Sequence, residues 1–449
     1  MQLPPTNKFA GLQPHVFMKY ALKNVIVLDG TENMEPQDHV TVLINRDKIE
    51  AIVPSSYDTK DYEVIDMQGQ YIMPGMINLH AHLIGTGKPF KKELDLKKQA
   101  KRLNFSLTRK SAIRRILEML KTELMSGVTT IRTVGGFENT DTKIRDLLDH
   151  GEILGPRMIV SNKAISVTGG HLSGTLAYEA QSDEDVTHLV DQLKEQGVDF
   201  IKLMITDGVM DATGEEPGSL KMPESYVRAA VIRAHELKLK VAAHVEGQIG
   251  LSVALETGVD YIEHGSLISS SMIKDYKHNG TCNIATFSPY VAFSHVDPDL
   301  LDMTSEQIRA SEVVLKGIVE ATRGCIAHSI PVGLGSDPGY PFVTHYDMWR
   351  ELYYFTQFCD VDNNFALHTA TQVNAKILGI EYTRGTIEPG KFADLIVTRR
   401  NPLDDLSALK EISYIFTRGQ MIKSPSVERN EEIERSLDTV MQDIAQYQM

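Results

Sequence analysis

Cysteine is scarce in this sequence, which holds only three among 449 residues. Cys282, Cys325 and Cys359 lie far apart and form no Cys-x-x-Cys pair. This spacing predicts neither a disulfide framework nor a thiolate zinc site, and it is typical of a reducing compartment.

Long apolar runs and an excess of positive charge are also missing. No stretch approaches the roughly 18 apolar residues that a membrane-spanning helix needs. Residues 1–24 mix prolines with scattered polar residues, unlike a secretory signal. The 46 basic and 60 acidic residues give a formal net charge of −14, which argues against a nucleic-acid partner. We therefore expect a cytoplasmic protein that acts on a small molecule and binds neither nucleic acid nor a membrane.

Both ends of the chain are rich in short Val/Ile runs that are cut by turn residues. This pattern is typical of antiparallel strands. We predict that residues 1–72 and 386–424 together form one small β-sandwich domain.

The last segment, residues 425–449, is predicted to be a terminal helix. Ile433, Leu437, Val440 and Ile444 fall on one stripe at helical spacing. We expect this stripe to dock on the chain or to form a dimer contact, so the prediction is compatible with a homo-oligomer.

Between these ends, over residues 73–385, short apolar runs alternate with longer segments of helical period. Such alternation predicts repeated β-α units and a parallel sheet. Eight units indicate a (β/α)8 barrel, whose active site gathers at the carboxyl ends of the strands. The predicted strands are residues 73–82, 128–134, 157–161, 198–205, 239–244, 259–264, 282–287 and 332–337, and helices are expected over 111–127 and 224–239.

Polar side chains stand at the ends of five of these strands. His80 and His82 form an H-x-H pair, and the side-chain period of two turns both imidazoles to one side. Lys202 interrupts the apolar run VDFIKLMI, and lysine is almost never fully buried without a partner. The six residues predicted to converge are His80, His82, Lys202, His244, His264 and Asp337.

These residue types suit a pair of divalent metal ions. Zinc prefers imidazole and carboxylate ligands, whereas an ammonium group has no lone pair to offer. Desolvation favours the neutral amine of Lys202, which can take up carbon dioxide to give a carbamate able to bridge two metals. We expect one ion at His80, His82, Lys202 and Asp337 and the other at Lys202, His244 and His264. Zinc is the expected metal, although this ligand set accepts several.

The expected chemistry is hydrolysis of an amide-like bond. A hydroxide would bridge the two ions, and Asp337 would accept its proton and pass it to the leaving group. An alternative role for Lys202 is that of a Schiff-base nucleophile, but it leaves the histidines without a function.

The motifs resemble those of the amidohydrolase superfamily: MPGMINLHAH, IKL, AAHVEG, IEHG and GSD in the barrel, and ALKNVIVLDGT and GTIEPGKFADLIV in the flanks. The chain is most similar to the prolidase-like and imidazolonepropionase-related branch, partly through VTGGH at 167–171. That branch implies a binuclear zinc dipeptidase or carboxypeptidase, or an enzyme acting on N-acyl amino acids. It also implies a substrate contact for His171.

The sequence departs from this family in two places. Asn78 stands where many members have aspartate, and ITDG after Lys202 replaces the usual Thr-Gly-Gly. We therefore expect the ligand set to be kept and substrate selection to differ. Two alternatives remain open: a cyclic amidase or deaminase of the imidazolonepropionase kind that uses one metal, and a non-catalytic scaffold.

Overall fold

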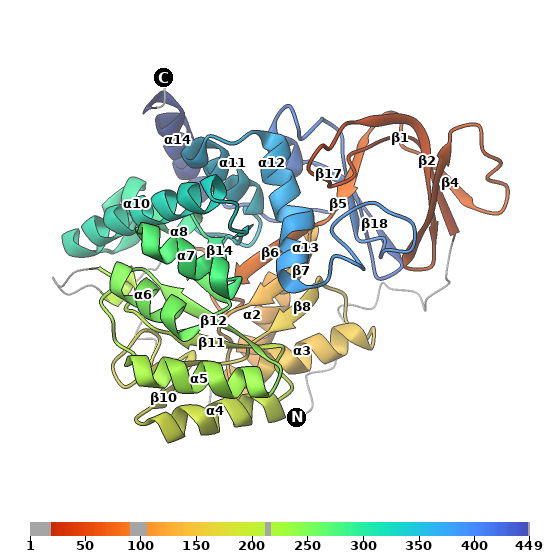
Figure 1. The fold of residues 1–449 in the computed structure, drawn as a ribbon. Coiled ribbons are helices and arrows are strands. Elements are labelled where there is room, and N and C mark those ends of the chain that lie inside the picture. The colour runs from red at the N-terminus through yellow and green to blue at the C-terminus, as the bar shows by residue number, and fades with distance from the viewer. Residues whose placement is uncertain (1–18, 90–105, 212–216, 448–449) are drawn as a thin grey trace.

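The computed structural model describes residues 19–89, 106–211 and 217–447. A barrel forms the larger part, and a smaller sheet built from both ends of the chain lies beside it (Figure 1). Residues 1–18, on which the expectation about a secretory signal mainly rests, are outside the described range. Among the described helices, none combines the length and the apolar character needed to cross a lipid bilayer.

Eight parallel strands make up the barrel, as the sequence predicts. They are β6 (Met76–Ala81), β7 (Val128–Thr133), β8 (Arg157–Val160), β11 (Phe200–Met204), β12 (Lys240–Val245), β13 (Tyr261–His264), β14 (Cys282–Ala285) and β15 (Val332–Leu334). In β11, β13 and β14 every side chain is buried, so both faces of these strands are covered, as in a parallel sheet. This architecture confirms the expected (β/α)8 fold class.

Hydrogen bonds outside the regular ladders complete the ring. The amide of Asp199 donates to the carbonyl of Val160 at 2.8 Å, which joins β8 to β11, and the amide of Asp337 donates to the carbonyl of His80 at 2.9 Å. Asn374 reinforces the second junction: its side-chain nitrogen donates to the carbonyls of Ile77 on β6 and Leu334 on β15. The last strand is thereby tied to the first.

Asn78, the departure from the family pattern, serves the same junction. Its side-chain nitrogen donates to the Ser336 hydroxyl at 2.9 Å, and its oxygen accepts from the amides of His80 and Ser336. An amide side chain can donate and accept at once, so asparagine suits this position.

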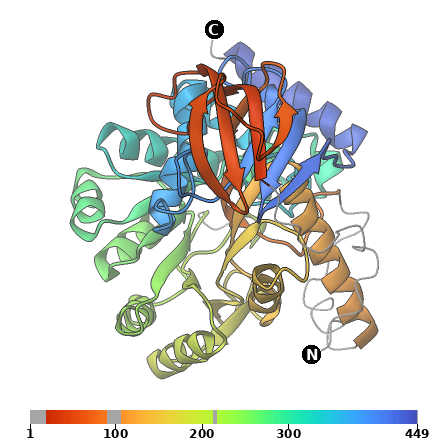
Figure 2. The same cartoon turned by 90° about the vertical axis from the view of Figure 1, so that its right-hand side faces the viewer.

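Helices cover the outside of the ring (Figures 1 and 2). They are α2 (Ser106–Met125), α3 (Thr140–Asp149), α4 (Asp183–Glu195), α5 (Glu224–Glu236), α6 (Gln248–Thr257), α7 (Ser270–Asn279), α8 (Ser288–His295), α9 (Pro298–Leu301), α10 (Ser305–Ala327), α11 (Met348–Cys359), α12 (Asn363–His368) and α13 (Asn374–Leu378). The predicted helices at 111–127 and 224–239 correspond to α2 and α5, with ends shifted by a few residues. Two short strands, β9 (Ala164–Val167) and β10 (Ala177–Ala180), extend the barrel sheet and were not predicted.

Apolar side chains fill the barrel interior below the strand ends. This cluster takes Ile77 and Leu79 from β6, Phe200 from β11, Tyr261 from β13 and Ile284 from β14. Because these strands lie around the ring, the space that their side chains share is its inside. The polar side chains of the candidate site lie beyond this cluster, at the carboxyl ends of the strands.

The smaller sheet combines strands from both ends of the chain. They are β1 (Lys19–Val27), β2 (Gln37–Asn45), β3 (Lys48–Pro54), β4 (Glu63–Asp66), β5 (Tyr71–Pro74), β16 (Leu395–Thr398), β17 (Ile412–Thr417) and β18 (Gln420–Lys423). Antiparallel pairing of β5 with β16 joins the two ends. The edge strand β3 also bonds to the segment before β16, where the Ile49 amide donates to the Lys391 carbonyl at 2.9 Å. The sheet therefore curls around its own apolar core.

The terminal helix α14 (Glu431–Tyr447) packs on the chain itself. Ile433, Leu437, Val440 and Ile444 are buried in the same core cluster as the barrel helices. Arg350 of α11 donates to Asp438 at 2.7 Å. Of the two roles expected for the apolar stripe, the structure shows docking.

Candidate active site

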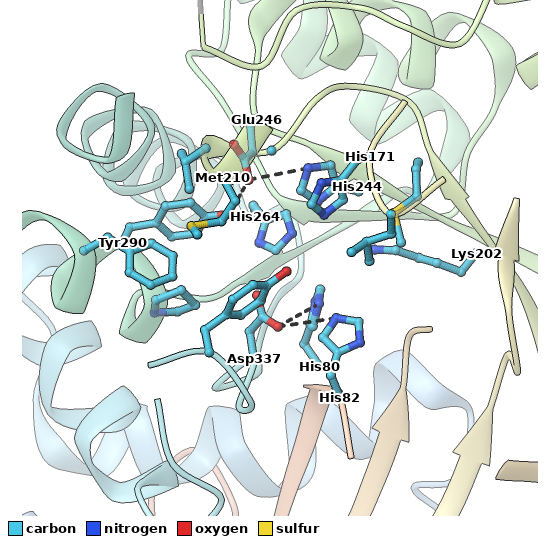
Figure 3. Close-up of a pocket in the computed structure, with 17 residues that line it drawn as sticks. His80, His82, His171, Lys202, Met210, His244, Glu246, His264, Tyr290 and Asp337 are labelled. Atoms are coloured by element: carbon cyan, nitrogen blue, oxygen red, sulfur yellow. Dashed lines mark hydrogen bonds and ion pairs between the residues drawn. The ribbon is translucent and has the colours of Figure 1, made fainter. Parts of the chain in front are cut away.

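The six residues predicted to converge line one pocket at the carboxyl end of the barrel (Figure 3). His80 is on β6 and His82 just after it, Lys202 is on β11, His244 is on β12, His264 ends β13, and Asp337 follows β15 by three residues. All six are buried. The pocket also takes in the rings of Tyr290, Phe293 and Tyr340, so polar and apolar side chains line it together.

One group of possible metal ligands consists of His80, His82 and Asp337. The Nε2 atoms of both imidazoles lie 3.5 Å from Oδ1 of Asp337. The opposite ring nitrogens have partners, since Nδ1 of His80 meets Glu263 at 2.8 Å and Nδ1 of His82 meets the Gly135 carbonyl at 3.0 Å. Holding one ring nitrogen while the other faces a common point is how proteins orient metal-binding histidines.

A second group consists of His244, Glu246 and His264. Nδ1 of His264 meets the Thr286 hydroxyl at 2.7 Å, which leaves its Nε2 for a ligand. Nε2 of His244 lies 3.4 Å from Oε1 of Glu246, and that oxygen accepts from the Tyr290 hydroxyl at 2.7 Å. The sequence prediction placed Lys202 with the two histidines and did not include Glu246.

Lys202 lies in the pocket wall with its amine unpartnered. The side chain is 1% exposed, and Nζ has no hydrogen bond from any described residue. Burial lowers the pKa of this amine to about 8, against the opposing effect of the Glu263 carboxylate. At neutral pH the uncharged form of this amine is therefore more populated than that of a lysine in water. Carbamate formation requires the uncharged form.

Burial also sets the ionisation of the other groups. It lowers the pKa of His82 to about 4 and the pKa values of His80, His244 and His264 well below the ordinary one. Neutral imidazole is the form that binds metal. The pKa of Asp337 rises to about 7 and that of Glu246 to about 8, again because of burial. Without a bound cation both carboxyl groups thus titrate near neutral pH beside four neutral imidazoles, and binding of a cation would favour their ionised forms.

His171, the predicted substrate contact, lies in the same pocket after β9. Its ring stacks on that of His244 with centroids 4.4 Å apart, and its Nδ1 lies 2.6 Å from Asp211 of the short helix η1 (Val209–Asp211). Gly208 packs against this ring so closely that an added Cβ would lie 2.7 Å from its Cε1. The glycine of the unusual ITDG segment is therefore needed to seat His171.

Backbone geometry turns two of the predicted ligands into the pocket. His264 has φ +68° and Asp337 has φ +47°, a left-handed conformation that non-glycine residues rarely adopt. On a regular strand, Glu263 and His264 would point to opposite sides. The turn at His264 lets both face the site, with Glu263 holding His80 and accepting from Arg132 at 2.5 Å.

Three residues at or beside the site were missed by the sequence analysis. Glu246 follows His244 by two positions, and the side-chain period of two could have indicated it. Glu263 was hidden by the turn at His264, which no sequence pattern shows. Tyr290 lies on α8, 44 residues after Glu246, to which its hydroxyl donates.

The comparison with known proteins agrees with this architecture. The model of the Amidohydrolase family matches residues 71–422. The chain belongs to the amidohydrolase family. It is a hydrolase that acts on carbon–nitrogen bonds, as the resemblance of its motifs predicted.

Several proteins named for different activities are similar to this chain. A solved structure of a prolidase candidate from Bifidobacterium longum is 30% identical, with a TM-score of 0.84 over 95% of this chain and 100% of that one. A Xaa-Pro dipeptidase with bound methionine is 24% identical, with a TM-score of 0.77 over 90% and 100%, which shows the fold alone. Ochratoxinase from Aspergillus niger is 22% identical over 88% of this chain and 85% of its own length.

Proposed function

We propose that this amidohydrolase cleaves the amide bond of a small substrate such as a dipeptide or an N-acyl amino acid. The observation that carries the proposal is the convergence of His80, His82, His244, His264 and Asp337 on one pocket with the unpartnered amine of Lys202. The similarity to the prolidase candidate favours peptide-like substrates.

Two divalent metal ions are proposed as cofactors, with zinc as the expected metal. His80, His82, Lys202 and Asp337 would hold one ion, and Lys202, His244 and His264 the other, with Lys202 converted to its carbamate. The residues fit this role because Nζ of Lys202 and Oδ1 of Asp337 are buried without a hydrogen bond from the described residues. Such orphaned atoms are costly unless a ligand satisfies them. Bound metal ions would activate a water molecule and polarise the substrate carbonyl.

Asp337 is proposed as the general base and acid. Its carboxylate lies at the centre of the pocket beside Nε2 of His80 and His82. A carboxylate in this position could take a proton from the attacking water and return it to the leaving nitrogen. His171, held at Nδ1 by Asp211, presents Nε2 to the substrate.

A cyclic amidase or deaminase is the second candidate function. An imidazolonepropionase from Picrophilus torridus is 22% identical over 87% of this chain and 92% of its own length, which favours this alternative. A one-metal mechanism, however, gives Lys202 no role and leaves its buried amine unexplained. A non-catalytic scaffold would be expected to lose the site residues, whereas all six are present.

A substrate screen tests the proposal. The metal-loaded protein is offered a library of dipeptides and N-acyl amino acids beside a panel of cyclic amides and aminopurines, and released amine is quantified. We expect hydrolysis in the first set and its loss after treatment with a chelator. Turnover confined to the second set would contradict the proposed function.

A further inference from the structure

Glu246 belongs to the second group of possible metal ligands, but the proposed function gives this buried acidic residue no role. It is the residue after β12, is 5% exposed and lines the pocket. Oε1 accepts from the Tyr290 hydroxyl at 2.7 Å, while Oε2 has no hydrogen bond from any described residue. A buried carboxylate oxygen without a partner costs free energy, so the position is expected to have a binding role.

The surroundings of Glu246 suit a cation. Three aromatic rings, those of Tyr290, Phe293 and Tyr340, line the pocket, and Figure 3 shows Tyr290 and Met210 beside the carboxylate. A carboxylate combined with aromatic rings is a usual receptor for an ammonium group. Among the described residues that line the pocket, Lys202 is the only one with an ammonium or guanidinium group, and Figure 3 places it on the far side of His244 from Glu246.

The position of Glu246 also limits which amine it can reach. Its carboxylate lies within 4.8 Å of nitrogens of His244 and His264, next to the place where the scissile amide would be held. In a dipeptide, the free α-amine is separated from the scissile carbonyl carbon by a single carbon atom. An α-amine, which is this close to the scissile bond, therefore lies within reach of Glu246. An amine at the end of a long side chain does not.

We propose that Glu246 binds the protonated α-amine of a dipeptide substrate, so that the enzyme selects peptides with a free amino terminus over their N-acylated forms. This inference rests on the proposed function, and it names one of the two substrate classes given there. Tyr290 is a positioning residue in this account, because its hydroxyl fixes Oε1 and leaves Oε2 to face the amine.

The test uses the dipeptide that the library screen shows to be hydrolysed fastest, together with its N-acetyl derivative, which contains the same scissile bond. Wild type, Glu246→Gln and Tyr290→Phe are compared in the metal-loaded state. Glu236→Gln, on the exposed face of α5, serves as the matched control. Metal content and thermal unfolding are measured on every variant.

We expect the wild type to prefer the free dipeptide. In Glu246→Gln the KM for that dipeptide should rise about 30-fold, because a buried charge partner is lost, with little change in kcat. The KM for the N-acetyl form should stay constant, and Tyr290→Phe should show a smaller shift in the same direction. Glu236→Gln should match the wild type.

Several results would overturn the inference while leaving the proposed function intact. One is that the wild type hydrolyses N-acyl amino acids but no free dipeptide. Another is that Glu246→Gln loses activity equally on the dipeptide and on its N-acetyl derivative. A third is that Glu246→Gln loses metal, which would make Glu246 a ligand. Failure of the wild type to hydrolyse any compound of either class would instead contradict the proposed function. If Glu246→Gln does not fold, an unchanged substrate preference in Tyr290→Phe overturns the inference.

Discussion

Asp337 at the barrel mouth and Asp394 at the junction of barrel and small sheet are equally buried, each 4% exposed. Their pKa values nevertheless shift in opposite directions. Burial raises the pKa of Asp337 to about 7. Burial also acts to raise the pKa of Asp394, but Arg157, Arg384 and Thr417 together outweigh it, and the pKa falls below its ordinary value. Arg157 donates to Asp394 at 2.7 Å, and the Thr417 hydroxyl donates at 3.0 Å.

The difference shows that partners, and not depth alone, decide what a buried carboxylate does. Asp394 is satisfied by its neighbours, so its role is to join two parts of the fold. Asp337 lacks such partners and lies beside Lys202, which is also unpartnered. The unsatisfied atoms of Asp337 and Lys202 belong to side chains that line the pocket, where a ligand can satisfy them.

The largest effect is expected from Lys202→Ala. Without the bridging group, at least one metal ion should be lost, and kcat/KM should fall by about 10³-fold or more, since metal ions supply several kcal/mol of transition-state stabilisation. Metal analysis and steady-state kinetics on the same preparation measure both effects. Short carboxylic acids added in solution should restore part of the activity by replacing the carbamate. Full metal content and full activity in this variant would refute the role of Lys202.

Asp337→Asn and Asp394→Asn should separate activity from stability. Removing the proposed base should lower kcat by about 10²- to 10⁴-fold and leave the metal-free protein no less stable. Asp394→Asn should keep kcat and lose about 3 kcal/mol of unfolding free energy, because Arg157 is left without its partner. Kinetics and denaturant unfolding of both variants give the comparison. A large loss of kcat in Asp394→Asn with the fold intact would remove the distinction between the two regions.

Glu263→Gln should have a moderate effect on metal binding. Glu263 holds Nδ1 of His80 and is itself held by Arg132, and loss of such a supporting carboxylate typically costs 10- to 100-fold in metal affinity. Competition with a chromogenic chelator measures the affinity, with Glu236→Gln as the control. An unchanged affinity would show that His80 needs no support from Glu263.

The most gradual effect is expected in the pH dependence of stability. In the metal-free protein the folded-state pKa of Asp337 lies above its ordinary value, so the folded state holds a proton that the unfolded state has lost. Stability relative to Asp337→Asn should therefore fall as pH rises from about 4 to about 7, by at most about 1.4 kcal/mol per pH unit. The contribution of Asp394, with its lowered pKa, is present above its ordinary pKa and is lost as pH falls. If the difference in unfolding free energy between the wild type and Asp337→Asn does not change between pH 4 and 7, the raised pKa of Asp337 is contradicted.

Much of the barrel could be predicted because its strands are short apolar runs, and five of the eight carry a polar residue near their end. His80, His82 and Lys202 could be expected to lie together, since strand ends of a parallel barrel meet at one mouth, and all three line the same pocket. The strands β9 and β10 were missed because each has only four residues and carries no clear alternation.

Other features depend on backbone geometry or on contacts distant in sequence. The positive φ of His264 brings Glu263 and His264 to the same site, against the alternation of a regular strand. The side chain of Asn374 bonds to the carbonyl of Ile77, 297 residues away, and no local pattern indicates that contact. Glu246 was within reach of sequence reasoning through its spacing from His244.

The central claim is that the unsatisfied groups at the barrel mouth hold a pair of metal ions. Elemental analysis of the intact chain, purified without chelator in the presence of bicarbonate, tests it most directly. The account predicts close to two divalent ions per chain in the wild type and one or none in Lys202→Ala. Fewer than one ion per wild-type chain, or the same content in both proteins, would contradict it.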